Sequence, residues 1–168
     1  MRYDVQPKST IAKQILAVVV ILLIALLQTT VIRGLEVFHV VPNLLFITVV
    51  IVGLLRGDYC GLSVGVLCGF LLDIMGGRAV GSNTLLCTYV AYLCTRISGS
   101  LFNRNVFVSM VFVLLFSVPY ELFIYIFNFV IWGKGAWGYA LFCKILPAVI
   151  YNFLFTIVLY PVVRRLAE

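Results

Sequence analysis

Long apolar runs separated by short polar breaks fill almost the whole chain. The runs lie near residues 11–32, 43–55, 59–75, 83–97, 106–132 and 140–163. A helix that crosses a bilayer needs about 20 consecutive, mainly apolar residues, and most of the runs approach that length. The pattern therefore predicts an all-α polytopic membrane protein with about six transmembrane helices, forming a single membrane domain over residues 1–168.

The breaks between the runs indicate how successive helices are joined. Only Arg56, Gly57 and Asp58 separate the second run from the third, which predicts an antiparallel helix hairpin. Pro42 and Asn43 open the second run, and a proline is tolerated at a helix start because its missing N–H would have no partner there. The second run is short for a full span. We expect its helix either to be partly sunk into the protein or to be extended by residues 37–41.

The composition of the chain supports the membrane assignment. Of 168 residues, 64% are apolar and 11% are charged, against about a quarter charged in a soluble domain. No soluble domain is expected. The first run has no clear small-x-small cleavage site and is predicted to be a retained helix rather than a signal peptide.

The basic residues predict an orientation. The chain has 12 lysines and arginines against 6 acids, and they stand singly between apolar runs, which favours membrane topology and lipid headgroup contacts over nucleic acid. Six helices place both termini on one side, and the basic residues divide eight to four in favour of that side. Both termini are therefore predicted to be cytoplasmic.

A row of small residues is the most distinctive local pattern. Positions four apart lie on one ridge of a helix, and glycine there lets another helix backbone approach closely. We expect the ridge to pack internally against the first, fourth or sixth helix, and it could also be a docking face for a partner helix. The ridge consists of Gly53, Gly57, Gly61, Gly65 and Gly69, and Asp73 continues its spacing.

Two acids lie within apolar runs, where a carboxylate is costly unless it is paired or hydrated. Asp73 ends the third helix, and we expect it to be an interfacial cap, an ion pair with Arg78, or a polar contact that fixes the glycine-rich loop. Glu121 follows Pro119 and is the most deeply placed acid. A proton or ion relay needs a second carboxylate at similar depth, and none is found. We therefore expect Glu121 to have a structural partner, with three candidates: Arg96, Tyr89 and Asn152.

No other pattern predicts catalysis, a metal or a cofactor. The lone His39 has no ligand-like neighbour, and no nucleophile elbow, metalloprotease motif or phosphate-binding loop is found. The cysteines lack metal or redox spacing and are expected to be small buried apolar residues. They are Cys60, Cys68, Cys87, Cys94 and Cys143.

The ordered set of residues between 42 and 95 resembles the family of the rod shape-determining protein MreD. The resemblance rests on Pro42-Asn43-Leu44-Leu45, the glycine row, Gly69-Phe70-Leu71-Leu72-Asp73, Gly81 and Tyr89-Val90-Ala91-Tyr92. It implies a non-catalytic component of the bacterial inner membrane that takes part in cell elongation and peptidoglycan synthesis. It also implies a fold similar to the S components of energy-coupling-factor transporters. The positions that match the family pattern are Pro42, Asn43, Gly61, Gly65, Gly69, Asp73 and Gly81.

The resemblance also implies partners. We expect a scaffold that docks the single-span protein MreC through helix–helix contacts, with indirect links to MreB, RodA and a penicillin-binding transpeptidase, in contact with membrane lipid. The alternative is a vitamin-binding S component, which needs small residues four apart on the first helix and polar groups that converge on a pocket. Neither is found. An intramembrane enzyme or channel ranks last, because only Glu121 is a clear ionisable group within a span.

Overall fold

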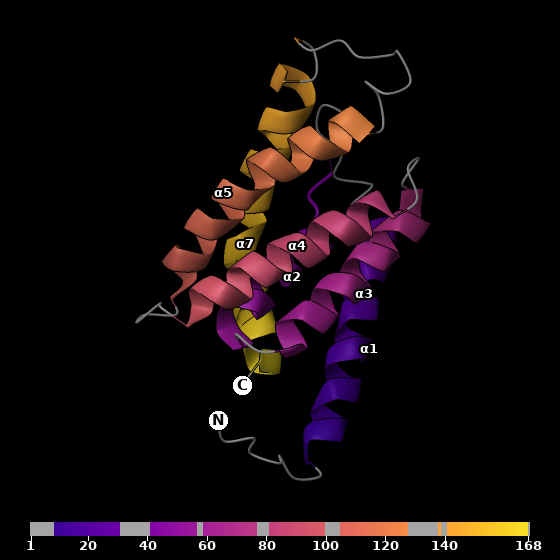
Figure 1. The fold of residues 1–168 in the computed structure, drawn as a ribbon, viewed down its shortest axis with the longest axis vertical. Coiled ribbons are helices and arrows are strands. Elements are labelled where there is room, and N and C mark those ends of the chain that lie inside the picture. Colours follow the sequence, from indigo (N-terminus) through magenta and orange to yellow (C-terminus); the bar gives the residue numbers. More distant parts are fainter. Residues whose placement is uncertain are drawn as a thin grey trace.

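The computed structural model describes residues 9–30, 41–56, 59–76, 81–99, 105–127, 138 and 141–167, and its regular elements are all helical. These ranges contain six α-helices and one π-helical turn. They are α1 (Ser9–Thr30), α2 (Leu44–Arg56), α3 (Tyr59–Gly76), α4 (Ser82–Ser98), α5 (Val106–Tyr125), η3 (Leu141–Ile145) and α7 (Leu146–Ala167). The all-α prediction is therefore confirmed for the described residues (Figure 1).

Three helical stretches within these ranges are long and apolar enough to cross a membrane. They are Tyr59–Gly76, Val106–Tyr125 and Leu141–Arg165, the last running through η3 into α7. The described part of α5 leaves α-helical geometry at Tyr125, before the predicted end at 132, and residues 128–137 lie outside the described residues. The final helix continues to Ala167, past the predicted end at 163, so the two terminal arginines belong to its last turn.

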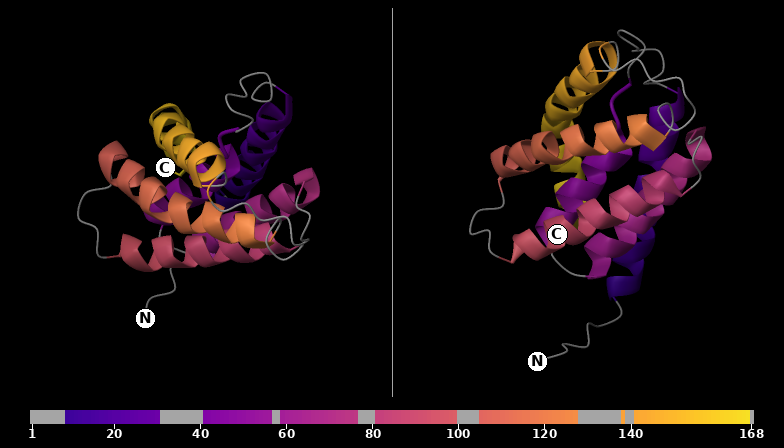
Figure 2. Two further views of the ribbon diagram at one scale, coloured as in Figure 1. Left: turned by 90° about the horizontal axis from the view of Figure 1, so that it is seen from above. Right: turned by 45° about the horizontal axis from the view of Figure 1, so that its top comes forward.

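The centre of the assembly is α2. Leu45, Phe46, Ile47 and Val50 have no exposed surface, and α2 contacts α1, α3, α4, α5 and α7. Its 13 residues span about 20 Å at 1.5 Å per residue, against about 30 Å for a hydrocarbon core. Of the two explanations for its shortness, burial within the protein fits; residues 37–40 lie outside the described residues. The views in Figure 2 show α2 enclosed by the other helices.

The glycine ridge packs inside the protein, against α4. A Cβ added at Gly65 would lie 2.5 Å from the Ala91 Cβ, and one added at Gly69 would lie 2.5 Å from the Thr84 Cα. From the other side, a Cβ at Gly53 would lie 2.8 Å from the Cys94 Cβ. Helix α4 thus packs closely against both α2 and α3, because the glycines of these two helices have no side chain that would hold α4 away.

The burial of this ridge corrects one expectation. Gly61, Gly65 and Gly69 are buried and face α4, so the interpretation of these three residues as a docking face for a partner helix is wrong. Gly57 lies outside the described residues.

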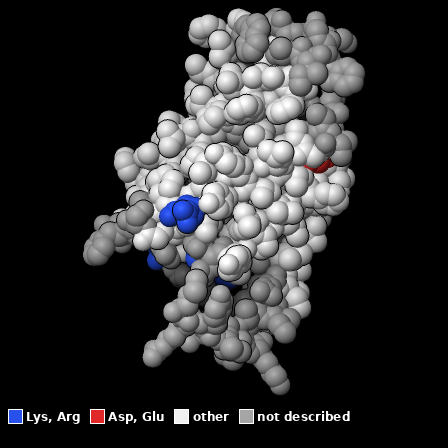
Figure 3. Space-filling model, in the orientation of Figure 1, with Lys and Arg blue, Asp and Glu red and all other residues white. Residues whose placement is uncertain are grey.

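The start of α1 and the end of α7 lie at the same end of the molecule (Figure 1). In the same orientation, the lysine and arginine side chains visible on this face gather in its lower half, toward that end (Figure 3). The basic helix ends that the structure describes include Arg56 of α2, Arg96 of α4, and Arg164 and Arg165 of α7. The molecule therefore has a basic end formed by helix termini distant in sequence.

Candidate functional site

Polar side chains from five helices and their caps form one connected hydrogen-bonded cluster, which we call the polar network. Inside a bilayer an unpaired polar group is costly, so such groups are expected to satisfy one another. Most members are buried, and the cluster lies within the helix assembly. The polar network consists of Asn43, Asp73, Asn83, Thr84, Ser117, Tyr120 and Asn152.

Asp73 of α3 caps the N-terminus of α4. Its Oδ1 accepts hydrogen bonds from the backbone N–H and side-chain amide of Asn83, both at 3.1 Å, and its Oδ2 accepts from the backbone N–H of Thr84 at 3.0 Å and its hydroxyl at 2.5 Å. The positive end of the helix dipole also favours a carboxylate there. Asp73 thus satisfies two N–H groups that have no partner within α4.

Gly81 explains why this cap comes from another helix. It occupies the N-cap position of α4 with φ 92° and ψ −13°, a left-handed conformation that favours glycine. Glycine has no side chain to bond the first free N–H groups, so Asp73 takes that role. The predicted kind of contact, a cap near the glycine-rich segment, matches what the structure has at Asp73. The suggested partner Arg78 lies outside the described residues.

Tyr120 of α5 joins the start of α4 to the start of α2. Its hydroxyl donates to the Asn83 side-chain oxygen at 2.8 Å and accepts from the Asn43 side-chain amide at 3.3 Å. Its ring lies against Phe46, with 4.3 Å between ring centroids. Tyr120 is 3% exposed, so both hydroxyl contacts are shielded from solvent and lipid.

Asn43 organises the N-terminus of α2. Its side-chain oxygen accepts from the Phe46 N–H at 3.0 Å, as an N-cap does, while its own N–H donates to Asn152 at 2.8 Å. The Leu45 N–H donates to the side-chain oxygen of Gln28 in α1 at 3.2 Å. Pro42, which is buried, has no N–H that would need a partner there. The start of the central helix is therefore bonded to α1, α5 and α7.

Asn152 completes the network from α7. It is fully buried, and its amide donates to the Ser117 hydroxyl of α5 at 3.3 Å. The Thr156 hydroxyl bonds the Asn152 carbonyl at 2.6 Å. The polar groups of the network bond each other, and of its members only Asp73 and Thr84 also line the α3–α4 groove described below, so the network has the arrangement of a structural core.

Glu121 lies beside this network in sequence without joining it. Among the described residues, no hydrogen bond or ion pair links it to any of the three partners expected from the sequence. Asn152 bonds Asn43 and Ser117 instead, Tyr89 is exposed on α4, and the Arg96 guanidinium lies 6.0 Å from the Tyr92 ring centre. The expected partnership of Glu121 with these side chains is therefore wrong.

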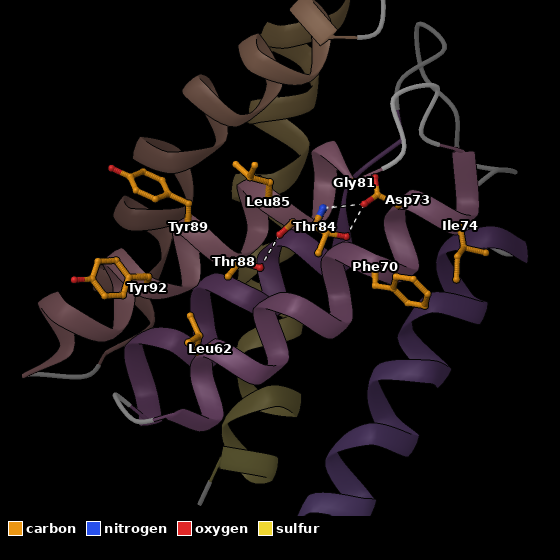
Figure 4. A pocket seen from close by; sticks show the side chains of 10 residues that line it. All are labelled: Leu62, Phe70, Asp73, Ile74, Gly81, Thr84, Leu85, Thr88, Tyr89 and Tyr92. Carbon is orange, nitrogen blue, oxygen red and sulfur yellow. Dashed lines mark hydrogen bonds between the residues drawn. The ribbon is translucent and has the colours of Figure 1, made fainter.

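A long groove runs along the outer side of α3 and α4, with a volume of about 930 Å³. Figure 4 shows Asp73, Gly81 and Ile74 toward one end of this α3–α4 groove and Tyr89 and Tyr92 toward the other. Most of its wall is apolar or aromatic, so it suits an apolar rod-shaped occupant. Its lining residues are Leu62, Phe70, Asp73, Ile74, Gly81, Thr84, Leu85, Thr88, Tyr89 and Tyr92.

The cysteines and acids of the described ranges give no sign of a metal centre. No group of three His, Cys, Asp or Glu side chains within those ranges could hold a metal ion. All five cysteines are free thiols, and Cys68, Cys87 and Cys94 are buried. The last two are among the small residues with which α4 faces the ridge glycines.

The structure brings together residues that the sequence analysis treated separately, and adds others. Asn43 and Asp73 belong to the polar network, and Pro42 and Gly81 flank it. The sequence analysis missed Asn83, Thr84, Ser117 and Tyr120. Asn and Thr at a predicted helix start are capping signals, and this signal could have identified Asn83 and Thr84. Nothing in the sequence marked the Tyr120 hydroxyl.

An all-helical assembly with apolar outer faces and an internally satisfied polar core defines a small integral membrane protein. Residues 9–168 match the family described as rod shape-determining protein MreD, and the chain belongs to that family. No curated protein and no solved structure matches the chain. The protein is accordingly a membrane protein with a role in rod shape determination, from a family not known for enzymatic activity.

Proposed function

We propose that this protein is a non-catalytic scaffold of the bacterial inner membrane that binds the single transmembrane helix of an MreC-like protein in the α3–α4 groove. Family membership supports the role in rod shape. The groove is the observation that carries the docking proposal, because it is a mainly apolar surface on two helices, α3 and α4, that pack closely against each other.

We infer from two features that this pair of helices is rigid. Gly65 and Gly69 bring the α3 and α4 backbones into close contact, and Asp73 bonds the first turn of α4. A rigid platform loses little conformational entropy when a partner binds. The glycine ridge therefore supports docking indirectly, since it holds the two walls of the groove together.

The walls of the groove offer the contacts that join helices in lipid. Leu85 is 68% exposed and Tyr89 is 58% exposed on α4, and Phe70 is 58% exposed on α3. Helices associate in membranes through van der Waals packing and interhelical hydrogen bonds, and the hydroxyls of Tyr89 and Tyr92 add polar groups to a mainly apolar wall. One transmembrane helix lying along the groove would replace lipid chains against these side chains.

The remaining parts of the proposal concern topology and distant partners. Six membrane-embedded helices with both termini in the cytoplasm would put the basic end on the cytoplasmic face, in accord with the positive-inside rule. MreB, RodA and a penicillin-binding transpeptidase would be reached through the MreC-like partner. The family resemblance implies an S-component-like arrangement of helices. Vitamin binding is not part of the proposal, because the polar network bonds itself.

Co-purification with the MreC-like protein tests the docking site. Leu85→Trp and Thr88→Trp place an indole in the groove and are expected to reduce recovery of the partner at least tenfold. Val158→Trp on α7, at a residue 65% exposed outside the groove, is the matched control and should leave recovery unchanged. Equal elution profiles of the three variants in size-exclusion chromatography would exclude misfolding as the cause.

A cell-shape assay complements this measurement. In a rod-shaped bacterium depleted of its own protein, the wild type and Val158→Trp should restore rods, whereas Leu85→Trp should leave round cells. Full recovery of both the partner and cell shape with Leu85→Trp and Thr88→Trp would refute the groove as the docking site.

A further inference from the structure

A second cavity, of about 330 Å³, separates part of α1 from the rest of the protein. We call it the α1 cavity. Its residues come from the middle of α1, from α2, from the first half of α3 and from the end of α7. They are Ala17, Val18, Ile21, Ile24, Thr48, Val52, Arg56, Cys60, Ser63, Val64, Leu67 and Val163.

Helix α1 is held to the assembly at only part of its length. Of its described side chains, Ile21, Ile24 and Ala25 are buried, whereas apolar neighbours such as Ile15 and Leu16 are exposed. Residues 17–24 of α1 thus face the rest of the protein across the cavity. A cavity of this size falls in the range of small-molecule sites.

The interior of the α1 cavity presents no free hydroxyl group. The Thr48 hydroxyl donates to the Leu44 carbonyl at 2.8 Å, and the Ser63 hydroxyl donates to the Cys60 carbonyl at 2.9 Å. Both hydroxyls are therefore satisfied within their own helices. The remaining wall is mostly aliphatic, so an occupant of the interior should be a hydrocarbon chain.

Basic side chains lie at one end of the cavity. Arg56, which is half-buried in the last turn of α2, lines the cavity. Val163 lines the same cavity and directly precedes Arg164 and Arg165 in the last turn of α7, which packs against α2. Cationic side chains between helices are the feature by which membrane proteins hold anionic headgroups.

We propose that the α1 cavity binds an anionic phospholipid, with one acyl chain in its aliphatic interior and the phosphate beside Arg56. The hydrocarbon wall and the single charged end match the two halves of such a molecule. The lipid would fill the gap behind α1 and join this helix to α2, α3 and α7. The site is separate from the α3–α4 groove, and the two proposals can fail independently.

Retention of lipid by the purified full-length protein tests the site. The protein is extracted, washed in detergent, and reconstituted with either phosphatidylglycerol or phosphatidylcholine, and bound lipid is counted by native mass spectrometry. The wild type is expected to retain one phosphatidylglycerol per chain and no phosphatidylcholine. Inorganic phosphate alone is expected to cause no thermal stabilisation, because the acyl chain is required.

Two variants act on the two halves of the site. Arg56→Gln should weaken phosphatidylglycerol binding about fivefold, the loss expected for one cation at a membrane surface. The control Arg96→Gln, at the end of α4, should leave this affinity unchanged. Ala17→Phe fills the interior and should abolish retention, whereas Val19→Phe, at an exposed residue of the same helix, should not.

Three results would overturn the proposal. They are equal retention of the two lipids by the wild type, equal affinity in the two arginine variants, and full retention in Ala17→Phe. Thermal unfolding in detergent without added lipid checks folding. If Arg56→Gln does not fold, Ala17→Phe and its control Val19→Phe still test whether the cavity binds lipid.

Discussion

The carboxylate of Asp73 is expected to be the most important single polar group for the stability of this protein. Its two oxygens accept four hydrogen bonds from Asn83 and Thr84 at the N-terminus of α4. The substitution Asp73→Asn keeps the shape of the side chain and replaces one acceptor oxygen by a donor NH₂ group. It therefore tests hydrogen bonding with little change in packing.

The magnitude follows from counting donors and acceptors. The asparagine oxygen can accept two of the four hydrogen bonds, and the NH₂ group can donate to the Thr84 hydroxyl, because a hydroxyl also accepts. One or two donors are then left without a partner, and at about 1–3 kcal/mol for each buried donor the cost is about 1–6 kcal/mol. Asp73 borders the α3–α4 groove, where water or a lipid headgroup can compensate in part. We expect a loss of about 3 kcal/mol in the free energy of unfolding, which lies within that range.

Equilibrium unfolding in mixed micelles, followed by circular dichroism, measures this loss. Glu121→Gln is the control, because it makes the same chemical change at a half-buried carboxylate that lies outside the polar network. It should alter the free energy of unfolding by less than about 1 kcal/mol, as most substitutions away from such features do. If Asp73→Asn costs no more than the control, the carboxylate does not hold the start of α4 and the account of the network fails.

Three other substitutions test separate parts of the structure by the same unfolding measurement. Gly65→Leu should destabilise the protein by about 3 kcal/mol or prevent folding, because even a Cβ there would lie 2.5 Å from the Ala91 Cβ and overpacking costs about 1–3 kcal/mol. The control Val66→Leu, at the exposed neighbouring residue, should be nearly neutral. Equal effects of the two substitutions would contradict the close approach of α3 and α4. Gly81→Ala should lower the free energy of unfolding by about 1 kcal/mol, because φ at this position is 92° and a residue with a Cβ is disfavoured in the left-handed conformation. If no stability is lost, the start of α4 adopts another conformation. Tyr120→Phe should lower the free energy of unfolding by about 2 kcal/mol, because it removes the hydroxyl partner of Asn43 and Asn83. The loss should be smaller when Asn83 is already replaced by alanine. Strictly additive losses would argue against a shared network.

The position of the ridge glycines changes what a loss of partner binding would mean. A bulky side chain at Gly65 or Gly69 would separate α3 from α4 and distort the groove between them. Loss of the MreC-like partner in such variants would therefore report damage to the groove rather than a direct contact. Substitutions at Leu85 and Thr88 avoid this ambiguity, because these side chains line the groove itself.

The sequence by itself determined the helical class of the protein and the approximate course of its helices. Apolar runs of bilayer length are a local property, since lipid rather than a folded core can solvate them. The four-residue spacing of Gly61, Gly65 and Gly69 likewise indicated close backbone packing, because it follows from the geometry of one helix. The membrane assignment and the family resemblance therefore needed no tertiary information.

Only the tertiary structure decided which surfaces are covered and which polar groups meet. The ridge could have faced a partner, and it faces α4 because small residues such as Ala91 lie opposite it. Asp73 could have paired with a cation, and it caps another helix because α3 and α4 converge where Gly81 has no side chain to bond the free N–H groups. Asn43 and Asn152 are 109 positions apart in the chain. Hydrogen bonding depends on distances of about 3 Å in space, and periodicity within one helix carries no information about such distances between helices.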